Sequence, residues 1–161
     1  MKESIIQKSE SLEFEQLKAI SSQMGNDKNL IQGSGGNTSL KEGNILFVKA
    51  SGKKLSQAKN ENIFVPINLE DIRYKFNNHN SQDELKIIPI DNVHLKPSIE
   101  TIFHAIMPHK IVFHCHSLEV IANTILPNIR ERLIPLLKDY LWDYIPYARP
   151  GLPIAKLIQS S

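Results

Sequence analysis

The chain has 161 residues, 41% of them hydrophobic, and its 19 basic and 17 acidic residues leave a formal net charge of +2. This length is sufficient for one globular domain with a sizeable core, and the near balance of charge gives no indication of a nucleic-acid or anionic-membrane partner. No apolar run approaches the ~18 residues of a membrane span, and the N-terminus lacks an apolar signal segment. The single cysteine excludes an internal disulfide, so we expect a cytoplasmic protein.

The first half of the chain predicts a helix, a glycine-rich loop and a β-hairpin. Apolar residues at helical spacing predict a helix over 10–24 that ends before Gly25. Residues 32–39 (Gln-Gly-Ser-Gly-Gly-Asn-Thr-Ser) form the glycine-rich stretch. The runs 39–41 and 45–49 flank a turn around Gly43, a pattern typical of a hairpin.

The middle of the chain predicts a short strand, a helix and a loop. Residues 63–67 are apolar enough for a strand, and Pro66 favours an edge or end position because proline cannot donate to a central ladder. Residues 70–76 are expected to be helical. The polar stretch 77–83 is expected to be a loop.

The second half predicts helices around one further strand. A helix over 98–107 lies between two prolines, and a strand is expected over 111–116. Helices follow over 118–126 and 128–142, the latter with a possible break at Pro135. A short extended piece over 145–147 precedes a last helix that Pro150 opens. This mixture of helices and strands indicates one α/β domain.

Two short segments have the composition of anion-binding loops. In the glycine-rich stretch, Gly36 allows a close backbone approach and Asn37 adds a side-chain donor. The stretch is neither a Walker A sequence nor a dinucleotide-binding glycine motif, and a tight connection into the hairpin explains it equally simply. Residues 50–53 offer Ser51 and Gly52, although serine–glycine pairs are also ordinary turn chemistry.

The strand predicted over 111–116 places two histidines on one face. Side chains alternate along a strand, so His114 and His116 point the same way and Cys115 points away, as a packed thiol rather than a ligand. Two imidazoles together with a carboxylate make most of a divalent-metal site. A chance His-x-His in a chain with six histidines is the alternative.

Glu100 is the carboxylate that fits this site. It lies in a predicted apolar helix, where a carboxylate needs a charged or hydrogen-bonding partner. Helical spacing also places His104 on the same face as Glu100, and the alternative for both is a pair on the helix surface. The aromatic residues before Arg149 are read as a core or oligomer-interface group in preference to a substrate contact: Tyr140, Trp142, Tyr144 and Tyr147.

Taken in order, these segments resemble the class II aldolase/adducin family. The resemblance rests on 35–39 (Gly-Gly-Asn-Thr-Ser), 50–55 (Ala-Ser-Gly-Lys-Lys-Leu), 97–101 (Pro-Ser-Ile-Glu-Thr) with His104, 114–116 (His-Cys-His), and 147–151 (Tyr-Ala-Arg-Pro-Gly). It spans about residues 10–158. The Pro-Ser-Ile-Glu-Thr form is closest to the rhamnulose-phosphate-aldolase-like branch, which is often joined to a short-chain dehydrogenase domain.

The resemblance implies a fold and a chemistry. The fold is a three-layer α/β/α sandwich with a central, largely antiparallel sheet, usually in a homotetramer. The chemistry is aldol cleavage of a small sugar phosphate by a zinc-dependent lyase, through an enediolate that the metal stabilises. By motif position, Glu100 corresponds to the catalytic acid/base and His114 and His116 to zinc ligands. The phosphate-binding positions correspond to Gly36, Asn37, Ser51, Gly52 and Ser98.

Two departures from the family pattern qualify this expectation. Ile99 occupies a position where the fuculose-phosphate aldolase pattern has a second serine, so one phosphate hydrogen bond is absent. The family's third histidine ligand lies in an Asn-His-Gly segment that residues 1–161 do not contain. We therefore expect a single domain that lacks this C-terminal segment, binds zinc or another divalent metal weakly and turns over little substrate. There are three alternatives. The first is a non-catalytic adducin-like domain that oligomerises or binds a partner. The others are a small-molecule binding module that keeps only the anion pocket, and an epimerase or dehydratase of the same family.

Overall fold

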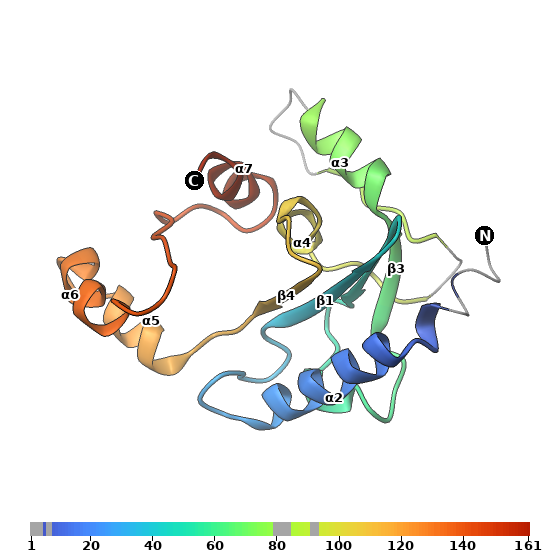
Figure 1. The fold of residues 1–161 in the computed structure, drawn as a ribbon, viewed down its shortest axis with the longest axis horizontal. Coiled ribbons are helices and arrows are strands. Elements are labelled where there is room, and N and C mark those ends of the chain that lie inside the picture. The colour runs from blue at the N-terminus through green and yellow to red at the C-terminus, as the bar shows by residue number, and fades with distance from the viewer. Residues whose placement is uncertain (1–4, 6–7, 79–84, 91–93) are drawn as a thin grey trace.

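A four-stranded antiparallel sheet forms the centre of the fold (Figure 1). The computed structural model describes residue 5 and residues 8–78, 85–90 and 94–161. The strands are β1 (Asn37–Glu42), β2 (Ile45–Lys49), β3 (Phe64–Asn68) and β4 (Ile111–His114), in the spatial order β3-β2-β1-β4. β3 and β4 are therefore the edges, and Pro66 lies on an edge strand as predicted.

Helices cover both faces of this sheet (Figure 1). One face carries α2 (Leu12–Asn26) and the 3₁₀ turn η1 (Leu55–Gln57). The other carries α3 (Leu69–Asn77), α4 (Thr101–Ile106) and α7 (Leu152–Ser160), with α4 packed between the other two. The α/β sandwich with a central antiparallel sheet is thus confirmed.

Alternation along β2 explains how one strand serves two cores. Ile45 and Phe47 are buried in the cluster that contains Phe14 of α2. Leu46 and Val48 are buried in the opposite cluster, with residues of α3 and α4. Successive side chains of a strand point to opposite faces, so this uninterrupted apolar run is what a central strand covered on both sides requires.

The hairpin between β1 and β2 follows the sequence closely. Gly43 adopts a φ of 59° in the two-residue turn between Glu42 and Ile45, a conformation that glycine accepts without steric cost. The strand β1 begins at Asn37, so the end of the glycine-rich stretch is already part of the sheet.

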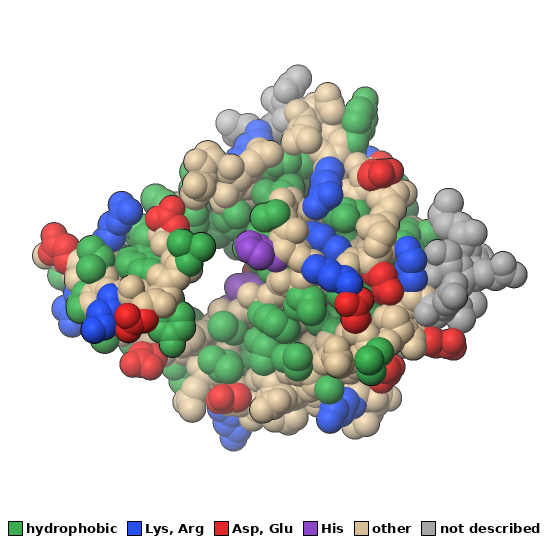
Figure 2. All heavy atoms as spheres, in the orientation of Figure 1, with side chains coloured by type: hydrophobic (Ala, Val, Ile, Leu, Met, Phe, Trp, Pro, Cys, Tyr) green, Lys and Arg blue, Asp and Glu red, His purple; other side chains and the backbone are tan. Residues whose placement is uncertain are grey.

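Two short helices form an arm outside the sandwich. α5 (Leu118–Thr124) contains no buried residue, and Leu133 is the one buried residue of α6 (Ile129–Leu136). The arm projects from the end of β4 (Figure 1). Figure 2 shows an opening between the arm and the rest of the molecule, bordered by histidine side chains. No helix in the described part of the chain is long and apolar enough to cross a bilayer.

Several predicted boundaries were wrong. The helix expected over 98–107 begins at Thr101, the strand expected over 111–116 ends at His114, and the helix expected over 128–142 ends at Leu136. In the last case Pro135 removes a backbone donor near the helix end, so the helix stops instead of continuing through a kink. The loop expected over 77–83 lies largely outside the described residues, because 79–84 are not among them.

Candidate functional site

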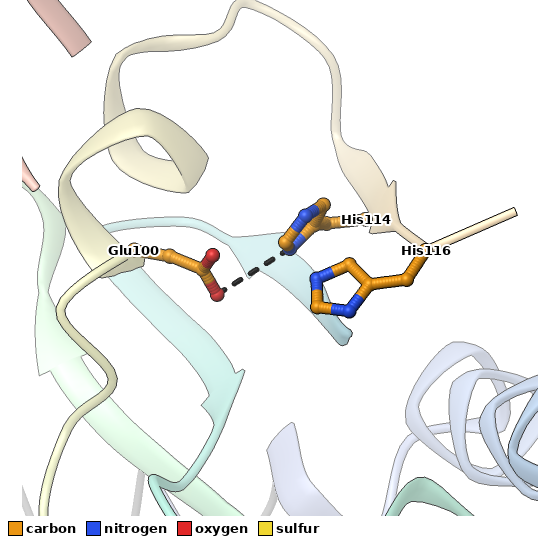
Figure 3. A group of neighbouring side chains, drawn as sticks. All are labelled: Glu100, His114 and His116. Atoms are coloured by element: carbon orange, nitrogen blue, oxygen red, sulfur yellow. Dashed lines mark ion pairs between the residues drawn. The ribbon is translucent and has the colours of Figure 1, made fainter. Parts of the chain in front are cut away.

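Glu100, His114 and His116 converge at one end of the sheet (Figure 3). Each offers one ligand atom, and these atoms lie within 4.8 Å of one another. Glu100 Oε2 lies 3.3 Å from His114 Nδ1, and both side chains are about a quarter exposed. The three residues are therefore close enough to share one ion and open enough for a ligand to reach them.

These side chains come from three different parts of the fold. Glu100 is the N-cap residue of α4, and His114 is the last residue of β4. His116 follows the strand and is fixed by its backbone N–H, which donates to the carbonyl of Leu30 at 2.8 Å. The two imidazole rings lie 4.9 Å apart between centroids, so the shared face predicted from strand alternation extends past the end of the strand.

The glycine-rich loop packs directly against the two histidines. At Gly35 a Cβ atom would lie 2.8 Å from Nδ1 of His116. At Gly36 a Cβ atom would lie 2.3 Å from Ile31 and 2.8 Å from the carbonyl of His114, and the φ of 63° also favours glycine. These glycines allow the loop to approach the end of β4 this closely.

Asn37 links the sheet to the carboxylate. It pairs with His114 across the β1–β4 ladder, and its Nδ2 donates to Oε2 of Glu100 at 2.7 Å and to Oγ of Ser98 at 3.2 Å. Its Oδ1 lies 3.2 Å from His114 Nδ1. Both halves of this amide are thus engaged inside the protein, where Asn37 is 1% exposed.

The pKa of Glu100 lies below its ordinary value. Burial pushes this pKa upward, but the hydrogen bond and charge of His114, the hydrogen bond from Asn37 and the charge of His104 together outweigh burial. Desolvation alone would raise the pKa of Glu100, but the surrounding donors stabilise the ionised carboxylate. Glu100 is ionised at neutral pH and is poised to accept a proton or a cation.

His104 is a buried residue and not half of a surface pair. Its ring is fully buried, with Nδ1 2.7 Å from Ser39 Oγ and Nε2 2.6 Å from Asn37 Oδ1. Burial and the neighbouring His114 lower the pKa of His104 to about 3, so the ring is neutral. The reading of Glu100 and His104 as an exposed helix pair fails because Glu100 caps α4 and His104 points into the sheet.

Three loops meet beside this cluster. The buried Nζ of Lys49 donates to the carbonyl of Ser34 at 2.8 Å and to that of Lys53 at 2.7 Å. An isolated bridge between Ala50 and Pro97 joins the second loop to the segment before α4. The glycine-rich loop, residues 50–53 and residues 97–100 are thus neighbours, although they are far apart in the sequence.

The residues expected to bind phosphate have different environments. Gly36 and Ser98 are buried, whereas Ser51 and Gly52 are exposed. Ser51 and Ser98 line one cavity of about 510 Å³, together with Lys86 and Arg149. Gly36, Asn37 and Gly52 do not line it. Glu100 and His114 line a second cavity of about 350 Å³, whose walls include Phe103 and Ile154.

Sequence reasoning missed three residues near this site. The sequence predicts no role for these three. His104 and Arg149 are part of segments that resemble the family, and Lys49 ends a predicted strand. The signal for Lys49 was a lysine at the end of an apolar strand, directly before a turn. No sequence signal distinguishes Arg149 from other surface arginines.

The structure also bears on the expectations for Cys115 and for the aromatic residues before Arg149. Cys115 is exposed, so its interpretation as a packed thiol is wrong. Cys115 directly follows β4, which is an edge strand, and Phe113 on the same side of the backbone is also exposed. Tyr140 and Tyr147 are 71% and 90% exposed, so these two do not belong to the core.

Comparison with known proteins identifies the family. A family model described as Class II Aldolase and Adducin N-terminal domain matches residues 15–160. The chain belongs to this family. The class II aldolase domain at the N-terminus of a conserved protein from Thermoplasma acidophilum superposes with a TM-score of 0.72 at 25% identity, and the match covers 89% of this chain and 72% of that one.

One curated relative of this class II aldolase/adducin domain is much longer than the chain itself. The uncharacterized oxidoreductase YuxG of Bacillus subtilis (strain 168) is 33% identical over 159 residues. That match covers 89% of this chain but only 23% of the relative. The chain therefore spans about a quarter of the length of that protein.

Proposed function

We propose that this class II aldolase/adducin domain carries a metal-dependent aldolase-type lyase site for a small sugar phosphate. Glu100 is the acid/base of this proposal, His114 and His116 are metal ligands, and the carboxylate of Glu100 is also within reach of the ion. Gly36, Asn37, Ser51, Gly52 and Ser98 contribute to the site for the phosphate. The convergence of Glu100, His114 and His116 carries the proposal.

The donor set fits zinc or a similar divalent ion. Imidazole nitrogens and carboxylate oxygens bind zinc at about 2.0–2.2 Å, so ligand atoms on one ion lie roughly 3.3–4 Å apart. The three ligand atoms lie within 4.8 Å of one another, and small side-chain rotations close the remaining gap. When bound, such an ion supplies Lewis-acid stabilisation of negative charge on a substrate oxygen.

Glu100 is suited to proton transfer beside that ion. Its lowered pKa keeps it ionised at neutral pH, so it acts first as a base. Asn37 and Ser98 hold Oε2, while Oε1 accepts no hydrogen bond from any residue that the structure describes. This leaves one oxygen to exchange a proton with the substrate while the other keeps the carboxylate in place.

The cavity beside Ser51 and Ser98 supports the anion part of the proposal. Two hydroxyls and two cationic side chains, Lys86 and Arg149, line it, and a phosphate needs hydrogen-bond donors together with positive charge. The buried amide of Asn37 supports this subsite indirectly, because it fixes Ser98 through a hydrogen bond. Arg149 is a further candidate for the phosphate site.

The exposed arm favours one alternative. An adducin-like domain that oligomerises without catalysis would use apolar surface such as that of α5 and α6, where Ile125 and Leu136 are 78% and 60% exposed. Self-association is also compatible with an enzyme, so we include a homo-oligomer in the proposal. An epimerase or dehydratase would use the same metal and phosphate residues. The proposed setting is the cytoplasm, with the chain as a single domain.

Metal binding tests the first part of the proposal. Calorimetry should detect zinc binding to the wild-type chain, and His114→Ala or His116→Ala should weaken it by more than about 100-fold, since loss of even an outer-shell partner typically costs ~10–100-fold. His109→Ala, an exposed histidine away from the cluster, is the control and should leave the affinity unchanged. Equal affinity in all four proteins would refute the site.

Turnover tests the second part. A coupled assay for dihydroxyacetone phosphate should be run with ketose 1-phosphates and added zinc, on the wild-type chain and on Glu100→Gln. Any cleavage should disappear in Glu100→Gln, which keeps the shape of the side chain but cannot accept the proton. Zinc binding without cleavage of any ketose phosphate would favour the non-catalytic alternative, and cleavage that survives in Glu100→Gln would contradict the role of Glu100.

A further inference from the structure

A buried chain of hydrogen bonds runs from the middle of β1 to the carboxylate of Glu100. Ser39 Oγ lies 2.7 Å from His104 Nδ1, His104 Nε2 lies 2.6 Å from Asn37 Oδ1, and Asn37 Nδ2 donates to Glu100 Oε2 at 2.7 Å. Ser39, His104 and Asn37 are all at most 1% exposed. No solvent reaches these three side chains, so each must be satisfied by the others.

The direction of every hydrogen bond in this chain can be derived. The ionised carboxylate of Glu100 only accepts, so the NH₂ group of Asn37 must face it. The carbonyl oxygen of Asn37 then faces His104, and Nε2 of the neutral ring must carry the proton. This leaves Nδ1 without a proton, and the hydroxyl of Ser39 donates to it.

The alternative orientation of Asn37 is unfavourable. With its amide reversed, Oδ1 would stand 2.7 Å from Glu100 Oε2, and two acceptors at hydrogen-bond distance repel each other. The NH₂ group would then face Nε2–H of His104, donor against donor. The His104 tautomer and the Asn37 orientation therefore enforce each other.

The strand period explains why histidine suits this place. Asn37 and Ser39 are two residues apart on β1 and lie on the same face. The imidazole offers a donor and an acceptor on opposite sides of one rigid ring. From α4, His104 bridges both positions at once.

We propose that His104 is a positioning residue that, with Ser39, fixes the amide of Asn37 and through it the carboxylate of Glu100. This inference rests on the proposed function, since it assigns His104 a role in the site of Glu100, His114 and His116. His104 does not contact the substrate. By donating to Oδ1 of Asn37, it stabilises the orientation in which the NH₂ group of Asn37 meets Glu100.

The test combines zinc affinity with a double-mutant cycle. His104→Leu should lower the zinc affinity about 10–100-fold, the usual effect of losing an outer-shell partner, and His104→Gln should recover part of it because its amide N–H can donate to Asn37. In a Glu100→Ala background, His104→Leu should have no further effect, since coupled residues are non-additive. An equal, additive loss in both backgrounds would overturn the proposal and leave His104 a core residue.

Ser39→Ala tests the same hydrogen-bond chain in case the histidine variants misfold. It removes one hydroxyl and should lower zinc affinity in the same direction as His104→Leu but by less, because both tautomers of His104 become accessible. Thr124→Ala, which removes an exposed hydroxyl on the arm, is the matched control. Unchanged zinc affinity in Ser39→Ala, with the melting temperature preserved, would count against the positioning role of His104.

A metal-independent measurement separates this inference from the proposed function. In apo protein, NMR should find His104 as the Nε2–H tautomer and the side-chain NH₂ of Asn37 protected from exchange. That protection should survive in His104→Gln and vanish in His104→Leu. If the wild type binds no zinc, the proposed function fails, while loss of protection in His104→Leu still supports the positioning role of His104. If zinc binds but the Asn37 amide is equally protected in all variants, the positioning role of His104 is wrong and the proposed function stands.

Discussion

Gly35 is the residue at which the loop and the candidate metal site meet most closely. Its φ is not among the positive ones, so alanine is compatible with the backbone there. The nearest atom to a Cβ there would be Nδ1 of His116 at 2.8 Å, followed by the carbonyl oxygen of Gln32 at 3.0 Å. Substitution at this position therefore acts first on His116, with a smaller adjustment of the turn at Gln32.

We expect Gly35→Ala to displace His116 and weaken zinc binding by about 10-fold or more, the scale of an outer-shell change. Titration calorimetry measures the affinity, and the melting temperature should change little. Ser34→Ala, at the exposed neighbouring position, is the matched control. Equal zinc affinity of the Gly35→Ala and Ser34→Ala proteins would mean that His116 is free to move without consequence.

Lys41 is a buried cation with no carboxylate partner among the described residues. Its Nζ donates to the carbonyls of Met107 at 2.7 Å and His109 at 2.6 Å. Burial, with a smaller contribution from the charge of Arg73, lowers the pKa of Lys41 from 10.5 to about 8.

This shift predicts how stability depends on pH. Between pH 8 and 10.5 the folded chain has lost the proton of Lys41 while the unfolded chain still binds it, so the free energy of unfolding rises with pH in this range. Denaturant unfolding at several pH values should show that rise in wild type relative to Lys41→Met. Lys59→Met, at an exposed position, should follow the wild type, and parallel curves for wild type and Lys41→Met would disprove the shift.

The proximity of Glu100 to His114 and His116 could be predicted from strand alternation and motif order. The burial of His104 could not, because its hydrogen-bond partners Ser39 and Asn37 come from a distant strand of the chain. The lowered pKa of Glu100 could not be predicted either, since desolvation can be inferred from an apolar segment but the donors from Asn37 and His114 come from distant parts of the chain.

Among the elements, the start of α4 illustrates how tertiary contacts override a local pattern. Residues 98–100 have helical composition, yet Pro97 is held in a bridge to Ala50 and the hydroxyl of Ser98 accepts from the backbone N–H of Glu100 at 3.3 Å. Such serine turns compete with helix formation. The strands of the hairpin were predicted well, because their turn and alternation are local properties.

The two loops joined by Lys49 should behave as one element. Burial lowers the pKa of Lys49, while the charge of Glu100 acts in the opposite direction. Lys49→Met would leave the carbonyls of Ser34 and Lys53 without their donor, at a cost of about 1–3 kcal/mol. Hydrogen exchange should accelerate in residues 33–36 and 51–54 together, while the β1–β2 ladder is unaffected.

Lys53→Met provides the control for this experiment. It removes an exposed ion pair with Glu61 but keeps the backbone carbonyl that Lys49 uses, and exposed pairs contribute little to stability. Exchange in the two loops should then remain as in wild type. Faster exchange in only one loop of Lys49→Met would contradict the idea that the lysine couples them.

At the scale of the whole molecule, several of the most exposed apolar side chains lie on the arm and on the segment after it. They include Ile125, Leu136, Tyr140 and Leu141, of which Leu141 is fully exposed. An isolated exposed leucine is ordinary, but several exposed apolar residues on one segment of the chain make it a candidate interaction surface. The family resemblance predicts a homo-oligomer, and this surface is where we expect the subunits to meet.

A double variant, Ile125→Asp with Leu141→Asp, should reduce self-association without unfolding the sandwich, because neither residue is buried. Light scattering after size exclusion measures the mass over a range of concentrations. Leu12→Asp, with a leucine that is 74% exposed on α2, is the control and should associate as wild type does. A wild-type chain that stays monomeric at all concentrations would rule out this surface as a subunit contact.

The pairing of Asn37 with His114 in the sheet also has a consequence for folding. The β1–β2 hairpin closes over two residues, whereas the β1–β4 ladder joins residues that are 77 positions apart. Pairings with high contact order carry a large loop-closure entropy and form slowly. The candidate site is therefore among the last parts of the molecule to assemble, and a refolding chain would acquire its metal-binding geometry only when the final strand docks.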